Sequence, residues 1–192
     1  MDPMTDAFWN WFKDEAHRLR AMELDTLTDT LARALSTHAP GLGVEVSPAE
    51  AEDQDVEVLF TAHRERMHFS RARDLVAAAP DVPGFRFIAL RPAQDFDVVL
   101  ETEGVELDGT ELTFEPLLGP AGVGLRLFVP EAAAAQPELK DLLWLMLETG
   151  LGEEVASGLS HLEVSPRSAS ESADALPLIE LPHFLSSAAL RP

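Results

Sequence analysis

The sequence predicts an α+β fold, in which helices pack mainly on one face of an antiparallel or mixed sheet. Three observations support this class. Apolar residues recur at helical spacing near the N-terminus and over residues 139–147, whereas they alternate in short runs between residues 42 and 129. These runs follow one another instead of alternating strictly with helices, which is typical of α+β proteins. An Asp-Gly pair between two of the runs indicates a tight turn and antiparallel pairing.

The N-terminal part of the chain is predicted to be helical. A first helix is expected over residues 2–22, capped by Asp2 or Thr5, because apolar side chains recur there every three or four residues. These side chains are Phe8, Trp9, Trp11, Phe12, Ala16 and Leu19. A second helix is expected over residues 25–38, since the Pro-Gly pair at 40–41 is a typical stop signal.

The middle of the chain reads as strands separated by one helix. Alternation of apolar and polar residues predicts strands at 42–46, 56–60, 84–90 and 123–129. Helical spacing predicts a helix over 70–79. We also expect a hairpin over residues 105–115, with its turn at Asp108-Gly109, because glycine tolerates the positive φ that such turns need.

The last third of the chain is predicted to contain the most buried helix. This helix starts at Gln136 or Pro137 and is apolar nearly all round, with Gly150 just past its end. A strand is expected at 159–164, and a short C-terminal element, with a helix from Pro182, completes the chain.

Length and composition predict one domain over residues 1–192. The hydrophobic fraction is 46%, which is enough for a sizeable core. Within this domain we expect a helical segment, an α+β core, a flexible polar loop and a tail at residues 1–40, 42–164, 165–175 and 176–192, respectively. The chain has no cysteine, and its N-terminal residues lack the pattern of a signal peptide, so we expect a cytoplasmic protein.

Charge limits the classes of partner. The chain has 34 acidic and 14 basic residues, a net charge of -20, and the imbalance is larger over residues 101–192 (net -12) than over 1–100 (net -8). Such a surface repels nucleic acid phosphates and anionic membranes, and it attracts basic proteins. We therefore expect neither a nucleic acid nor a membrane partner.

Eight carboxylates lie within residues 95–115, and five of them are the first candidate binding site. These five are Glu103, Glu106, Asp108, Glu111 and Glu115. They have three interpretations: a cation or acid–base site, a docking surface for a basic protein, or the solvated face of a hairpin. Their spacing does not match a calcium-binding EF-hand loop.

The second candidate is the one basic cluster in the chain, an alternative anion site. It contains His63, Arg64, Arg66, His68, Arg71 and Arg73. Arginines are suited to phosphate or carboxylate, and histidines to metal, but the spacing is not that of a helical HExxH motif. The competing interpretation is a surface loop whose arginines balance nearby acids. We expect no metal site and no cofactor.

The aromatic residues of the first helix also have two interpretations. Trp9 and Trp11 pack in the core, or they join two copies of the chain in a homodimer.

Six motifs, taken together, resemble a group of uncharacterised bacterial proteins. They are FWNWF (8–12), GFRFIALRPAQDFD (84–97), VELDG (105–109), GLRLFVP (124–130), LETGLGE (147–153) and LPLIELPHF (176–184). Members of this group begin with an FWxWF helix and have a strand that ends in Lys-Pro-Pro before GFDF, whereas this chain has Arg91-Pro92-Ala93. The resemblance implies an α+β fold and a bacterial cytoplasmic protein. It implies no activity.

These observations favour a non-enzymatic protein-binding module, because the chain has a strong net charge and no recognisable catalytic motif. One version is an immunity or antitoxin protein that masks a basic effector. The alternative is an enzyme that binds a small molecule or anion at the His63–Arg73 cluster.

Overall fold

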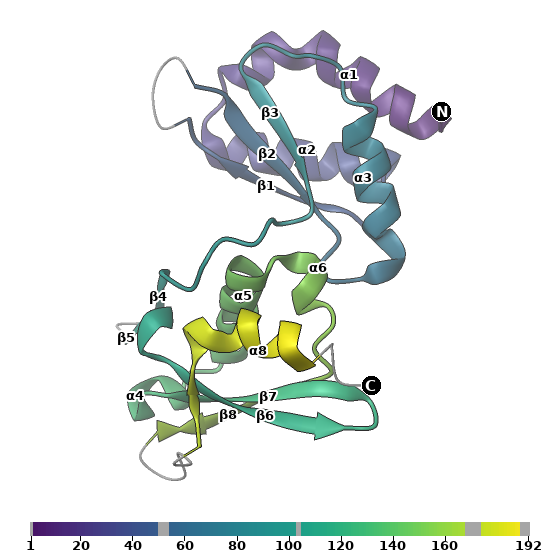
Figure 1. The fold of residues 1–192 in the computed structure, drawn as a ribbon. Helices are drawn as coiled ribbons and strands as arrows, with labels where there is room; N and C mark the ends of the chain where they lie inside the picture. Colours follow the sequence, from purple (N-terminus) through teal and green to yellow (C-terminus); the bar gives the residue numbers. More distant parts are fainter. Residues whose placement is uncertain (1, 50–53, 103–104, 168–173, 189–192) are drawn as a thin grey trace. The chain divides into compact units, whose positions relative to one another are not determined.

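The computed structural model describes residues 2–49, 54–102, 105–167 and 174–188. The chain divides into two compact units, Met1–Arg91 and Pro92–Pro192, called here the first and second units. Both combine helices with mixed or antiparallel strands, so the fold is α+β (Figure 1).

The first unit has a three-stranded sheet in the order β1-β2-β3. Strands β1 and β2 are antiparallel, whereas β2 and β3 are parallel because α3 connects them. The elements are α1 (Pro3–Arg20), α2 (Leu24–His38), β1 (Gly43–Ser47), β2 (Val56–Thr61), η1 (Arg66–His68), α3 (Phe69–Ala77) and β3 (Phe85–Ala89).

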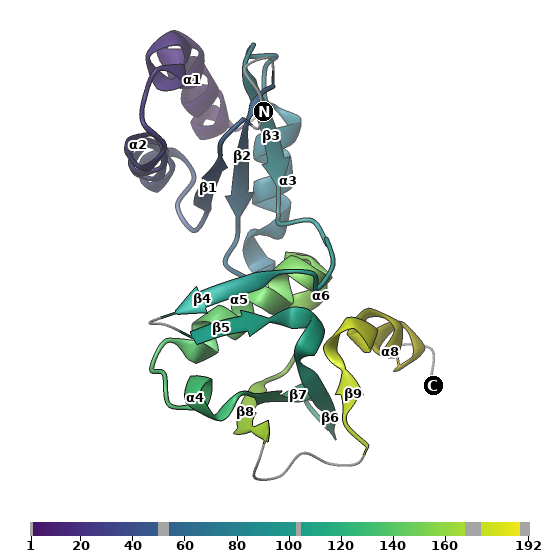
Figure 2. The same cartoon turned by 90° about the vertical axis from the view of Figure 1, so that its left-hand side faces the viewer.

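One face of this sheet is apolar and is covered by helices. The register aligns Val46, Val58 and Phe87 across the three strands, so their side chains share a face. This face packs with buried residues of α1, α2 and α3 in one cluster, and Figure 2 shows α1 and α2 on the same side of the sheet. The opposite face holds the ion pair of Glu57 with Arg86 at 2.9 Å. Helices on one face are what the sequence predicts.

The second unit has a four-stranded sheet in the order β8-β7-β6-β9 and a separate ribbon of β4 and β5. In the sheet, β7 and β8 are parallel and the other pairs are antiparallel. The elements are β4 (Val99–Thr102), β5 (Val105–Asp108), η2 (Gly109–Glu111), β6 (Thr113–Gly119), β7 (Gly122–Val129), α4 (Glu131–Ala134), α5 (Leu139–Leu151), α6 (Glu153–Ala156), β8 (Leu162–Pro166), β9 (Leu176–Pro177), η3 (Leu178–Glu180) and α8 (Leu181–Ala188).

The predicted single core over residues 42–164 is replaced by two. Among the described residues, buried hydrophobic side chains form two clusters, one in each unit. Within the described ranges, the strands form three sheets instead of the single one predicted. Residues 1–40 cover the sheet of the first unit and are part of its core. Alternation shows which face of a strand is apolar, but it does not show which other face will cover it.

The predicted hairpin over residues 105–115 is wrong. Strand β5 pairs with β4, and β6 pairs with β7 and β9. Asp108 and Gly109 instead begin a 3₁₀ turn, η2. Gly109 is needed for a close approach, since any side chain there would collide with the carbonyl of Phe96. A tight hairpin joins β6 and β7 at Gly119–Gly122.

The predicted end of the long helix is also wrong. Helix α5 continues through Gly150 to Leu151, and the residue with positive φ is Gly152, at 78°. Gly150 is buried inside the helix, where a side chain would collide with the ring of Phe96. Packing, not helix termination, therefore explains this glycine.

Candidate functional site

An exposed group of carboxylates on and beside the β4–β5 ribbon is the candidate site. We call this group the acidic ribbon, and it consists of Asp95, Asp97, Glu101, Glu106 and Glu111, all exposed. Glu101 and Glu106 are direct cross-strand partners. No ion pair joins either side chain to another described residue. Like charges in this position repel each other, so this arrangement does not stabilise the ribbon.

Asp108 is held by the turn that follows the ribbon. Its carboxylate accepts hydrogen bonds from the Thr110 backbone N–H at 2.8 Å and from the Thr110 hydroxyl at 2.7 Å. The hydroxyl bond, followed by the backbone bond, lowers the pKa of Asp108 below its ordinary value. These bonds give Asp108 a structural role at the start of η2.

Glu115 forms an ion pair within the sheet. Arg126 on β7 lies between Glu115 on β6 and Glu163 on β8, with N–O distances of 2.9 and 2.8 Å. The hydrogen bond that Arg126 donates to the carboxylate of Glu163 is the largest contribution that raises the pKa of Arg126 above its ordinary value. Of the predicted acidic residues, Glu106 and Glu111 therefore lie on the acidic ribbon, Asp108 and Glu115 have partners, and Glu103 lies outside the described residues.

The basic cluster lies in the first unit, beside the end of α2. The guanidinium of Arg71 donates to the carbonyls of Pro40 at 3.0 Å and His38 at 3.4 Å. A cation at a helix C-terminus is favourable because the carbonyls there carry partial negative charge. Arg73 lies over the ring of Phe69, with its guanidinium carbon 6.0 Å from the ring centroid. Arg71 and Arg73 thus have contacts that support the fold.

The two histidines of this cluster pack against the turn that follows α2. A side chain at Gly43 would collide with the imidazole of His63, and one at Gly41 with that of His68. His68 also lies 3.3 Å from the carboxylate of Glu65. His63 and Arg64 have φ values of 52° and 65°, a conformation that costs free energy in residues other than glycine.

The structure therefore gathers His63, His68 and Arg71 around one turn, while Arg73 lies over Phe69 and Arg66 is exposed in η1. Arg64 is partly buried. Over the described ranges, no three His, Cys, Asp or Glu side chains lie close enough together to hold a metal ion. An anion site at this cluster stays a prediction, and the donors of Arg71 face backbone carbonyls within it.

Trp9 belongs to the core of the first unit. It is 3% exposed, and its indole N–H donates to the carbonyl of Leu75 at 2.8 Å. Its ring meets the ring of Phe87 at 4.6 Å between centroids. Trp11 is partly buried against the same cluster. A dimer joined through α1 would therefore depend on Trp11 and not on Trp9.

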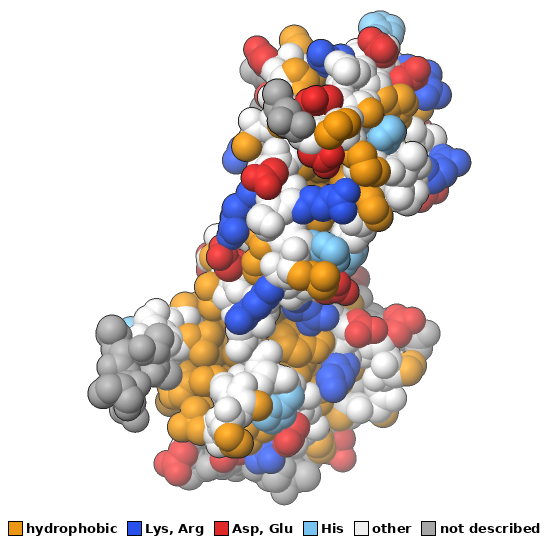
Figure 3. Space-filling view, turned by 90° about the vertical axis from the view of Figure 1, so that its right-hand side faces the viewer, with side chains coloured by type: hydrophobic (Ala, Val, Ile, Leu, Met, Phe, Trp, Pro, Cys, Tyr) orange, Lys and Arg blue, Asp and Glu red, His pale blue; other side chains and the backbone are white. Residues whose placement is uncertain are grey.

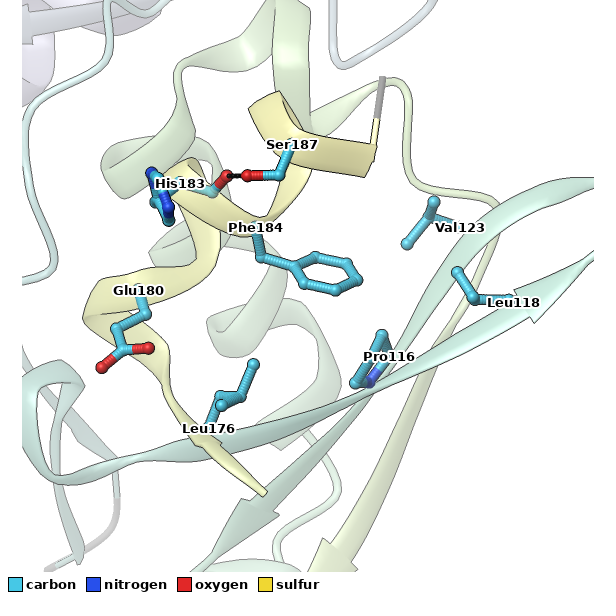
Figure 4. A pocket seen from close by; sticks show the side chains of 8 residues that line it. All are labelled: Pro116, Leu118, Val123, Leu176, Glu180, His183, Phe184 and Ser187. Carbon is cyan, nitrogen blue, oxygen red and sulfur yellow. Dashed lines mark hydrogen bonds between the residues drawn. The ribbon is translucent and has the colours of Figure 1, made fainter. Parts of the chain in front are cut away.

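A groove in the second unit was not predicted from the sequence. It lies between α8 and the β6–β7 hairpin and has a volume of about 380 Å³ (Figure 4). It is lined by Pro116, Leu118, Val123, Leu176, Glu180, His183, Phe184 and Ser187. The sequence signal was the apolar pair Leu117-Leu118 at a strand end, since side chains of adjacent strand residues point to opposite faces.

Comparison with known proteins returned no similarity: no family model, curated protein or solved structure matches this chain. No helix in the described part of the chain has the length and apolar character needed to cross a membrane.

Proposed function

We propose that this protein is a non-enzymatic binding module that holds a basic protein on its acidic ribbon. The observation that carries the proposal is the pairing of Glu101 with Glu106 across the β4–β5 ribbon. Two exposed carboxylates in this position oppose folding, and a cationic partner placed between them would remove the repulsion. The free energy of binding would then include relief of this repulsion.

The charge of the second unit supports the same function. Residues 92–192 contain 18 acidic and 4 basic residues, a net charge of -14. One of the four basic residues, Arg126, lies between Glu115 and Glu163. The field around this unit would attract a basic protein and increase its association rate, most strongly at low salt.

The contacts of the carboxylates change which acidic residues are proposed to bind the partner. Asp108 and Glu115 are omitted because their hydrogen bonds and ion pairs serve the fold. Asp97 and Glu101 are added because they are exposed on β4 or just before it, and Glu101 pairs with Glu106 across the ribbon. Asp95 is exposed in the same segment, but its carboxylate accepts the backbone N–H of Asp97 at 3.1 Å, so it is left out of the test. The version that we favour is an immunity- or antitoxin-like protein of the bacterial cytoplasm that masks a basic effector.

The test compares two variants of equal net charge, of which one lacks carboxylates of the acidic ribbon and the other lacks carboxylates elsewhere. The ribbon variant has Asp97→Asn, Glu101→Gln, Glu106→Gln and Glu111→Gln. The control variant removes four exposed carboxylates of the first unit, through Asp14→Asn, Glu23→Gln, Asp74→Asn and Asp81→Asn. Binding of a labelled peptide of alternating lysine and serine is measured by fluorescence anisotropy at low and high salt.

We expect the ribbon variant to bind this peptide at least about tenfold more weakly than the control variant at low salt, because each released contact is electrostatic. The difference should shrink at high salt. Equal binding by the two variants would mean that net charge alone attracts the peptide, and the acidic ribbon would not be the site.

A further inference from the structure

In the groove between α8 and the β6–β7 hairpin, one side chain packs on the buried core and another is exposed to solvent. The ring of Phe184 on α8 meets the buried ring of Phe114 at 5.8 Å between centroids. Figure 4 shows Phe184 pointing from α8 toward the hairpin, where Leu118 and Val123 face the same space. The Leu118 residue is 71% exposed. Because Leu118 lies beside the apolar side chains of Val123 and Phe184, an apolar group packed there would remove several apolar surfaces from water at once.

The polar groups of the groove limit what can bind there. Glu180 is the single acidic side chain among the eight lining residues, and no Lys or Arg lines the groove. The hydroxyl of Ser187 donates to the carbonyl of His183 at 2.8 Å, so its proton is already used. The unit around the groove has a net charge of -14. An apolar group with a cation beside it therefore fits this site better than an apolar group with an anion.

We propose that this groove takes a large apolar side chain from an amphipathic, basic segment of the partner protein, with a Lys or Arg of that segment beside Glu180. This proposal rests on the proposed function, since it supplies the apolar contact for the same basic partner. The groove volume, about 380 Å³, is near the small end of the range for ligand sites. Figure 3 shows hydrophobic side chains gathered on the surface of this unit.

The partner is expected to insert side chains and not to add a strand. Among the described residues, strand β9 pairs with Thr113 and Phe114 of β6, and β6 itself continues past these two residues to Gly119. Pro116 lies in this part of β6 and has no N–H to donate, which weakens pairing with another strand. An amphipathic helix that lays its apolar face into the groove has no such requirement.

The test compares three labelled peptides of equal length by fluorescence anisotropy. The first is an amphipathic peptide of leucine and lysine, the second has glutamate in place of lysine, and the third has serine in place of leucine. We expect the leucine–lysine peptide to bind most tightly. Leu118→Ser should weaken its binding about tenfold, because one buried apolar contact is lost. Val155→Ser, at a residue of α6 that is 50% exposed, should leave it unchanged.

The charge of the groove is tested with Glu180→Gln. This variant should weaken binding of the leucine–lysine peptide about threefold and leave the leucine–glutamate peptide unaffected or slightly improved. Glu138→Gln, which removes an exposed carboxylate at the start of α5, is the matched control. In the wild-type protein, amide resonances of Leu118, Val123 and Phe184 should shift when the leucine–lysine peptide is added, and this measurement does not depend on a variant that folds.

Each contrary result has a distinct meaning. If the serine–lysine and leucine–lysine peptides bind equally and Leu118→Ser has no effect, the groove proposal is wrong, while the acidic ribbon can still bind the partner. If neither lysine peptide binds, the proposed function fails as well. If the leucine–glutamate peptide binds as tightly as the leucine–lysine peptide, the groove has no preference for a cation and the proposal is overturned.

A second copy of the chain could also occupy the groove, so the test must distinguish self-association from binding of a separate partner. Met67 is 78% exposed and lies between Arg66 and His68, so the first unit itself contains an apolar side chain beside a cation. A dimer seen by light scattering that is lost in both Met67→Ser and Leu118→Ser would show that the chain fills its own groove. That result would overturn the proposal of a separate partner.

Discussion

The two units of this chain are built from similar elements but use charged residues differently. The first unit has 16 acidic and 10 basic residues, a net charge of -6, and the second has 18 and 4, a net charge of -14. In the first unit, arginines pair with carboxylates on the sheet, as in Glu57 with Arg86 and Glu45 with Arg91. In the second unit, the acidic ribbon has no such partners among the described residues. Paired charges serve the fold in both units, since Arg126 also joins Glu115 and Glu163 on the sheet of the second unit, whereas the carboxylates of the acidic ribbon stabilise no such contact.

The largest effect is expected in the aromatic core of the first unit. Trp9→Ala should lower the free energy of unfolding by about 3–5 kcal/mol, because it removes a buried ring and leaves a cavity. It also leaves the Leu75 carbonyl without the indole donor. Urea denaturation followed by circular dichroism measures this loss. Trp11→Ala is the control, since Trp11 is only partly buried, and an equal loss from both variants would contradict the assignment of Trp9 to the core.

The next largest change in stability is expected in the core of the second unit, where packing and helix propensity predict opposite effects. Alanine favours a helix over glycine by roughly 1 kcal/mol, so propensity alone predicts that Gly150→Ala stabilises the protein. We expect destabilisation by about 1–3 kcal/mol instead, because the new methyl group collides with the buried ring of Phe96. Gly119→Ala is the control, since no atom lies near a side chain at that position. A rise in the thermal midpoint of Gly150→Ala would show that Phe96 moves aside.

A smaller effect depends on pH. The hydrogen bonds of Asp108 lower its pKa below the ordinary value of 3.8, so the folded state favours the charged carboxylate. The stability that the charged Asp108 contributes is fully present above the pKa that this carboxyl has in the unfolded chain. It is lost as the pH falls through the lower pKa that the carboxyl has in the folded protein. Asp108→Ala should therefore be less stable than the wild type at pH 7, and the difference should narrow below about pH 3.8. Asp81→Ala, at an exposed position, is the control for the loss of one carboxylate elsewhere in the chain.

The smallest expected change in stability tests whether the carboxylates of the second unit repel each other. Glu101→Gln should stabilise the protein by about 0.2–1 kcal/mol at low salt, because it removes the repulsion across the β4–β5 ribbon. Adding Glu106→Gln to this variant should give little further gain, since the repulsive pair is already broken. High salt should remove the effect. Additive gains from the two substitutions would mean that the carboxylates do not interact.

Part of the candidate site was visible in the sequence. Glu106 is exposed on β5, as the alternation indicates, whereas Glu111 is exposed in the 3₁₀ turn η2, where alternation does not apply. The sequence does not show that Asp108 accepts two hydrogen bonds from Thr110, or that Arg126 forms an ion pair with Glu115. The groove could not be predicted, because its walls come from residues 116–123 and 176–187, which only the folded chain brings together.

The sequence by itself determined the α+β class and most of the local elements. The spacing of Phe8 and Phe12 predicts α1, and the alternation of Val56, Val58 and Phe60 predicts β2, because these periods depend on neighbouring residues alone. Only the tertiary structure decided that β5 pairs with β4, that Gly150 lies inside α5 and that two cores form. These features depend on contacts between residues far apart in the chain, and a local period identifies an apolar face without identifying the surface that will cover it.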